Sequence, residues 1–221
     1  MWWKYLTGAA MAGVIVAAFM LPAPQIQIGD ASRIFFFHVP AALAGFVAFV
    51  VAAVYGAVYL KTRNLVADRR AAASAEVGLT FSTIALISGA IFANVTWGVF
   101  WNWDPRETTL LAVLLVYAAY FALRQAVGHP STRARLSAVY ILLGGVAAPF
   151  LFFVLPRMYV SLHPRDTLVS GGGEFAMTLP VGLTFGAAMV TYVLLYLWLF
   201  QLADRAGRIK EELDYQREHV L

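Results

Sequence analysis

Long apolar stretches dominate the chain and alternate with short segments in which charged residues, prolines and glycines gather. An α-helix needs about 20 predominantly apolar residues to cross the hydrocarbon core of a bilayer. Six stretches approach or meet this length, at residues 5–21, 41–60, 77–95, 105–123, 136–155 and 177–202. The pattern therefore predicts an all-α, polytopic membrane protein whose six transmembrane helices form a single domain over residues 1–221.

The polar segments predict connections at residues 22–40, 61–76, 96–104, 124–135 and 156–176, and a charged tail over residues 203–221. The first apolar stretch exceeds the ~7–15 residues of a signal-peptide core, so we expect it to be retained as a helix. Four polar residues of the third span alternate with small ones and are interpreted as helix-packing residues. They are Thr80, Ser82, Thr83 and Ser88.

Composition supports the membrane assignment and narrows the function. Of the 221 residues, 61% are hydrophobic and 13% are charged, which is outside the usual range of soluble domains. The net charge of +4 does not indicate nucleic acid, because basic residues in a membrane protein mainly record its orientation. The chain has no cysteine, so any cofactor must be held noncovalently. No charged residue lies in the middle of a span, which argues against an ion pump.

The basic residues predict how the chain is oriented. Twelve of the 16 Lys and Arg residues fall on the side that also holds both termini. Cytoplasmic loops carry an excess of Lys and Arg, so we expect both termini in the cytoplasm and the connection at 96–104 on the outer face. The four basic residues of the outer face are Arg33, Arg106, Arg157 and Arg165.

Tryptophan is concentrated in one connection. Half of the six tryptophans, Trp97, Trp101 and Trp103, lie within seven residues and are followed directly by Asp104. The residues of an interfacial aromatic belt are spread over many helix ends, whereas these tryptophans are gathered in a single connection. The cluster is therefore interpreted as a platform for a large planar ligand, with a plain aromatic belt as the alternative.

Two of the four histidines, His38 and His163, are predicted on the same face as the tryptophans, and His129 and His219 on the other. Two imidazoles can ligate a haem iron from opposite sides. We therefore predict a noncovalent, b-type haem with His38 and His163 as axial ligands and the tryptophan rings as its apolar bed.

Asp104 also has the features of a helix start. With Pro105 at the first helical position and Glu107 two residues later, it matches an N-cap with a capping box. Asp104 is therefore interpreted as the residue that fixes where the fourth span begins and aims the tryptophans, rather than as an iron ligand. The four outer-face arginines are candidates for pairing with carboxylates of the bound ligand, because guanidinium suits bidentate carboxylate recognition. They are Arg33, Arg106, Arg157 and Arg165.

The motif WGxxWxWD, which begins at Trp97, resembles the WWD domain of haem-handling proteins of cytochrome c maturation. Within that group, the RIxxxHVPAA segment that begins at Arg33 is similar to the first histidine region of the haem exporter protein C (CcmC) family. The LHP segment around His163 is similar to its second. The resemblance covers the chain from the first span to the sixth.

The resemblance implies a protein of the bacterial inner membrane that holds haem at the periplasmic face on a WWD loop at residues 96–107. It implies that His38 and His163 are the axial ligands and that Trp97, Trp101 and Trp103 contact the macrocycle. It also implies delivery of the haem to the periplasmic haem chaperone CcmE, beside the ABC transporter subunits CcmA and CcmB and the small membrane protein CcmD. We expect no turnover chemistry of its own.

Other functions remain open at this point. The WDPRET sequence that begins at Trp103 is also similar to the larger cytochrome c synthetase subunit CcsA and the haem lyase CcmF, which makes a CcsA-like synthetase subunit the enzymatic alternative. A plain permease subunit, with the tryptophans as an interfacial belt, is a third possibility. A b-type electron-transfer cytochrome is disfavoured because none of the predicted spans contains histidine.

Overall fold

The structure is a computed structural model that describes all residues except 1, 22, 24–27, 164–176 and 221, and only the backbone of residues 218–220. The described chain is helical throughout, without β-strands. Its elements are α1 (Trp2–Met20), the 3-10 helix η1 (Gly29–Ile34), α2 (Phe35–Thr62), α3 (Leu65–Trp97), α4 (Pro105–Ala126), α5 (Pro130–Pro149), the π-helix η2 (Phe150–Val154), α6 (Leu155–Met158) and α7 (Leu179–Val220). Six helical stretches of the described residues are long and apolar enough to cross a membrane, which confirms the predicted all-α class and number of spans.

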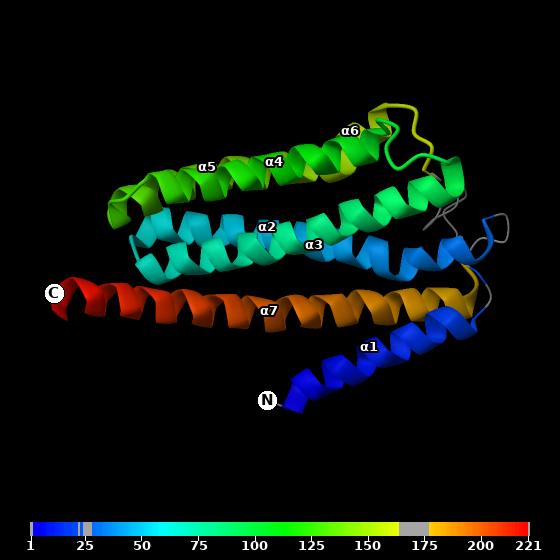
Figure 1. Ribbon diagram of the computed structural model, residues 1–221, viewed down its shortest axis with the longest axis horizontal. Coiled ribbons are helices and arrows are strands. Elements are labelled where there is room, and N and C mark those ends of the chain that lie inside the picture. Colours follow the sequence, from blue (N-terminus) through cyan, green and yellow to red (C-terminus); the bar gives the residue numbers. More distant parts are fainter. Residues whose placement is uncertain (1, 22, 24–27, 164–176, 221) are drawn as a thin grey trace.

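The helices form an elongated bundle around a central antiparallel pair, α2 and α3 (Figure 1). Helices α4 and α5 pack on one side of this pair, and α7, with α1 against it, packs on the other. The tryptophan-rich connection, η1, α6 and the start of α7 gather at one end of the bundle, which we term the loop end. Helix α1 begins and α7 ends on the opposite side (Figure 1).

The central pair is held close by small residues and a short link. Helix α2 ends at Thr62 and α3 begins at Leu65, with Asn64 capping α3 by accepting a hydrogen bond from the Val66 N–H at 2.9 Å. A Cβ added at Gly45 would lie 2.6 Å from the Ser82 hydroxyl of α3. Small residues of this kind let helix backbones approach closely within a membrane.

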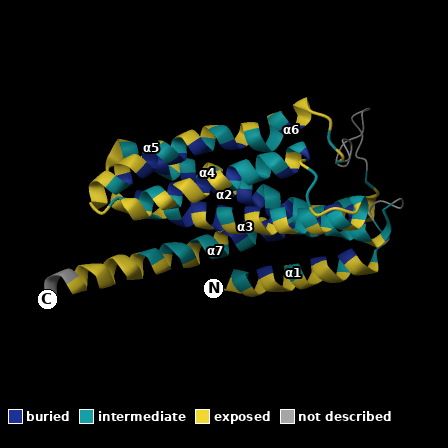
Figure 2. Ribbon diagram, turned by 45° about the horizontal axis from the view of Figure 1, so that its top comes forward, coloured by how far each residue is buried: buried dark blue, intermediate teal, exposed yellow. Residues whose placement is uncertain are grey.

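Exposed residues run along α1, α5 and α7 (Figure 2), and many exposed side chains of the bundle are large and hydrophobic. Phe19, Leu143 and Leu183 are among the large hydrophobic side chains that are exposed there. Inside, Phe49 of α2 stacks on Tyr117 of α4 with ring centroids 3.6 Å apart. The distribution suits a bundle surrounded by lipid, because an apolar exterior has a low free energy there.

Two predicted non-helical segments are in fact helical. The connection predicted at 61–76 is wrong, because only residues 63 and 64 separate α2 from α3. The tail predicted at 203–221 continues α7 as helix to Val220. Arg69 explains both differences: it bonds Asp204 at 2.9 Å and Glu211 at 2.7 Å, so these charged residues are paired between helices rather than placed in a loop.

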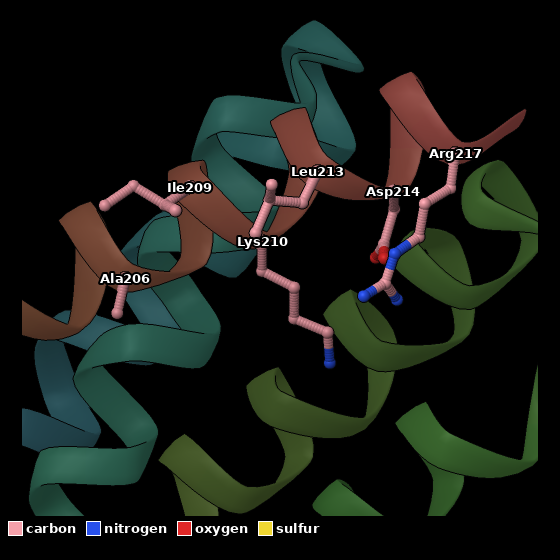
Figure 3. A pocket seen from close by; sticks show the side chains of 6 residues that line it. All are labelled: Ala206, Ile209, Lys210, Leu213, Asp214 and Arg217. Carbon is pink, nitrogen blue, oxygen red and sulfur yellow. The ribbon is translucent and has the colours of Figure 1, made fainter. Parts of the chain in front are cut away.

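The end of α7 carries a groove of its own. Its volume is about 410 Å³, and every residue that lines it comes from the last turns of α7 (Figure 3). The lining residues are Ala206, Ile209, Lys210, Leu213, Asp214 and Arg217. The groove lies at the opposite end from the tryptophans and is separate from the site described below.

The connection predicted at 22–40 is also too long. Helix α2 begins at Phe35, so His38 and Pro40 belong to the helix. Phe36 and Pro40 are fully buried, and their packing stabilises helix N-terminal to the predicted start of the span at residue 41. His38 therefore lies near the beginning of α2, at the loop end.

Candidate functional site

The tryptophan-rich loop, residues 98–104, joins α3 to α4. Gly98 closes α3 in the left-handed conformation with φ 79°, as helix C-caps commonly do. Asp104 caps α4 by accepting a hydrogen bond from the Arg106 N–H at 2.9 Å, which confirms the predicted N-cap. Pro105 is the first residue of α4, as expected.

The reciprocal half of the predicted capping box is wrong. Glu107 accepts a hydrogen bond from the backbone N–H of Asn102 at 3.2 Å, not from that of Asp104. The Asp104 N–H donates instead to the Asn102 side-chain oxygen at 2.9 Å. Asn102 therefore occupies the position that the capping box reserves for Glu107, and the loop turns more tightly than a simple helix start.

The tryptophan rings are arranged in two edge-to-face contacts. Trp101 meets Trp103 with centroids 5.6 Å apart, and Trp97 meets the imidazole of His163 at 5.3 Å. Trp103 is 71% exposed and has φ 60°, a conformation that is strained for a bulky residue. Strained backbone conformations cluster at active sites and ligand clamps.

Asp104 connects the tryptophan-rich loop to the segment at 161–163. Its Oδ2 accepts hydrogen bonds from the Ser161 hydroxyl and the Leu162 N–H, both at 2.8 Å. Its Oδ1 lies 3.0 Å from Nδ1 of His163. The Asp104 side chain is 1% exposed, so these contacts are shielded from water. One carboxylate thus caps a helix and holds a histidine that is 59 residues away in the sequence.

The charge state of this pair follows from its surroundings. Burial lowers the pKa of His163, and the positive charge of Arg106 lowers it further, although the Asp104 carboxylate acts in the opposite direction. Burial alone would raise the pKa of Asp104, but hydrogen bonds from Arg106, Ser161 and Leu162 keep it below its usual value. At neutral pH we therefore expect an ionised Asp104 beside a neutral His163 whose Nδ1 carries the proton.

His38 has a comparable arrangement built on a helix. Its Nδ1 lies 3.0 Å from the Ser88 hydroxyl of α3, and that hydroxyl donates to the Ala85 carbonyl at 3.1 Å. Because serine has a single proton to donate, its oxygen accepts from His38. Gly89 makes room for the ring, since a Cβ there would lie 3.0 Å from Cε1 of His38.

The two histidines match the donor set that a haem iron requires. Within the described part of the chain, both rings form their hydrogen bonds through Nδ1, so each Nε2 keeps its lone pair for a metal. Arg106 adds a positive charge near His163. The residues therefore fit an iron held by two imidazoles, beside exposed indole surface.

The predicted arginines differ in their contacts. The Arg33 guanidinium bonds Asp30 at 2.9 Å and the carbonyls of Ala18 and Leu21 at 2.5 and 2.6 Å, which ties the end of α1 to η1. Arg106 and Arg157 lie on α4 and α6, which are in contact, and their charges repel each other. Neither has a carboxylate partner within 4.0 Å in the described chain. Arg165 lies outside the described residues.

Sequence reasoning missed the partner of His38. Ser88 was interpreted as a packing residue, like Thr80 and Thr83. All three hydroxyls bond a carbonyl of their own helix, but Ser88 also bonds His38 of α2. The short link between α2 and α3 is the feature from which this contact could have been predicted. His38 lies 25 residues before Arg63 and Ser88 lies 25 residues after it, so an antiparallel helix pair brings them together.

Comparison with known proteins is consistent with this geometry. The family model described as "Heme exporter protein C" matches residues 1–217. The chain belongs to this family. The heme exporter protein C of Paracoccus denitrificans is 35% identical over 205 residues, with 90% of this chain and 83% of that protein covered. That of Rhodobacter capsulatus is 31% identical over the same shares, and that of Escherichia coli K12 is 30% identical over 70% of this chain and 63% of that protein.

Membership confirms the resemblance read from the tryptophan motif and both histidine segments. It supports a haem-handling role in cytochrome c maturation for this multi-pass membrane protein. The family name also points to transport rather than turnover chemistry, in agreement with the sequence prediction. Among the functions considered from the sequence, the synthetase subunit is therefore less well supported.

Proposed function

We propose that this chain binds a noncovalent b-type haem at the loop end and hands it to a periplasmic chaperone. His38 and His163 are the axial ligands, and Trp97, Trp101 and Trp103 form the bed for the macrocycle. The observation that carries the proposal is the pair of histidines, each held at Nδ1 and open at Nε2, beside the tryptophan-rich loop.

The charged residues of the loop end take different parts in the proposal. Arg106 extends from the first turn of α4 without a carboxylate partner in the described chain, which suits a haem propionate. Arg157 has the same chemistry on the neighbouring α6. Asp104 stays in the binding loop, where its carboxylate faces His163 and not the iron. Arg33 can pair with a haem carboxylate, as predicted, only when its hydrogen bonds to the carbonyls of Ala18 and Leu21 break.

The setting follows from the charge distribution and the family. We propose that the loop end faces the periplasm of the bacterial inner membrane and that both termini are cytoplasmic, because most Lys and Arg residues lie at the other end. The expected partners are the chaperone CcmE, the ABC transporter subunits CcmA and CcmB, and the small membrane protein CcmD. The haem is cargo in this proposal: the chain holds, orients and releases it.

An absorption spectrum tests the ligand assignment. The full-length chain in detergent, loaded with haem, is expected to give a low-spin spectrum of bis-histidine type. His38→Ala and His163→Ala should each convert it to a high-spin form and weaken binding. His129→Ala is the matched control, since His129 precedes α5 at the opposite end. A spectrum unchanged in both site variants would refute the assignment, and a wild-type chain without a specific Soret band would refute haem binding.

A further inference from the structure

The segment at 161–163 is joined to the rest of the loop end by a single residue. All three of its residues bond Asp104: Ser161 and Leu162 at 2.8 Å and His163 at 3.0 Å. Within the described chain, no other residue outside the segment forms a hydrogen bond with it. Trp97 also meets the His163 ring in an edge-to-face arrangement, with centroids 5.3 Å apart. The position of His163 therefore depends on one buried carboxylate.

We propose that Asp104 is the positioning residue of the haem ligand His163. Its carboxylate fixes the orientation and the Nδ1–H tautomer of the imidazole, and it tethers the non-helical segment that carries the ring. The inference rests on the proposed function, which makes His163 Nε2 the ligand atom. A carboxylate behind a ligating histidine also raises the basicity of the ligand, so Asp104 strengthens the bond to iron without touching it.

The same residue keeps two parts of the site in register. Asp104 caps α4 through the Arg106 N–H, and this cap fixes the end of the tryptophan-rich loop. The carboxylate that caps α4 also holds His163. The Asp104 side chain therefore fixes the position of His163 relative to the tryptophan-rich loop. A shift of the loop would move His163 with it.

The variant Asp104→Asn separates positioning from folding. Asparagine is an equally good N-cap, so its amide oxygen can still accept from the Arg106 N–H. Its NH2 group replaces the oxygen that accepts from Ser161 and Leu162, and the side chain offers His163 no negative charge. In the haem-loaded full chain we expect haem to dissociate about 10–100-fold faster, the usual effect of losing such a partner. We also expect a higher midpoint potential, because a less basic imidazole stabilises ferric iron less. Asp214→Asn, at the far end of α7, is the control and should change neither quantity.

The ligand-free chain provides a second readout. In a ¹⁵N-histidine NMR spectrum of the wild type, the His163 signals, assigned by their absence in His163→Ala, should show a protonated Nδ1. Asp104→Asn should weaken this preference. A wild-type His163 protonated at Nε2 would overturn the inference, even if the variant failed to fold or the wild type bound no haem.

The two failures can be told apart. If His163→Ala loses the bis-histidine spectrum while Asp104→Asn matches the wild type in dissociation rate and potential, the positioning role is refuted and the proposed function stands. If the wild type binds no haem but NMR shows the Nδ1–H tautomer that depends on Asp104, the proposed function is refuted and the positioning of His163 stands.

Discussion

The environments of His38 and His163 differ in how the ring is held. His38 belongs to α2, and its position is set by the packing of α2 against α3 before Ser88 contributes a hydrogen bond. His163 lies in a non-helical segment, and its position depends on contacts with Asp104. The partner of the first is a neutral hydroxyl, whereas that of the second is a buried carboxylate.

This difference indicates an asymmetric site. Hydrogen bonds to an ionised partner are about twice as strong as neutral ones, and an anionic partner makes the imidazole a stronger ligand. The ring on the rigid helix therefore has the weaker partner, and the ring on the separate segment has the stronger one. We infer that His38 would keep its place without its partner and that His163 would not.

The largest expected effect comes from comparing Asp104→Ala with Ser88→Ala. Loss of Asp104 removes the helix cap and every hydrogen bond that the described chain makes to the segment at 161–163 from outside it. We therefore expect haem to dissociate about 100-fold faster, the upper end for such partners. Loss of the Ser88 hydroxyl leaves the α2–α3 pair intact, so we expect haem to dissociate only about tenfold faster, the lower end for such partners. Transfer of haem to apomyoglobin measures both rates.

Stability should separate the two variants further. Removing an N-cap costs roughly 1 kcal/mol of folding free energy, so Asp104→Ala should lower the unfolding temperature in detergent, and Ser88→Ala should change it less. Equal dissociation rates in the two variants would contradict the asymmetry. So would a larger effect from Ser88→Ala.

The sequence was sufficient for the all-α class and the number of spans, but not for the contacts at the candidate site, and the ligand roles of its residues stay a prediction. Apolar length predicts a span because it reflects a property of each segment alone. The bond between Asp104 and His163 depends on where two connections meet in space, and no local pattern encodes it. The bond between His38 and Ser88 was within reach, because a two-residue link fixes the helix register, but the charges around Arg69 were taken as a loop.

A smaller effect is expected from Gly89→Ala. The added Cβ would lie 3.0 Å from Cε1 of His38, closer than most such contacts, so the ring must shift by a few tenths of an ångström. Helix propensity favours alanine by about 1 kcal/mol, so the protein should not become less stable while its haem affinity falls several-fold. Haem titration with thermal unfolding checks both.

Gly8→Ala is the matched control for this change. Gly8 lies within α1, and a Cβ there would meet nothing within 4 Å. The control should bind haem like the wild type. If Gly89→Ala also binds haem like the wild type, α3 does not confine the ring of His38. The inference that helix packing holds His38 in place is then wrong.

The smallest expected effect is that of Ser161→Ala, and it tests which bond of Asp104 matters. The variant removes two hydrogen bonds: the one that the Ser161 hydroxyl donates to Asp104, and the one that it accepts from the His163 N–H at 3.1 Å. The Asp104 carboxylate still faces Nδ1 of His163. Of these two bonds, the one to Asp104 bears on the carboxylate, and its loss is worth roughly 0.5 kcal/mol, or about twofold in haem dissociation. A loss as large as that of Asp104→Ala would mean that the fold of the segment, and not the carboxylate behind His163, holds the ligand in place.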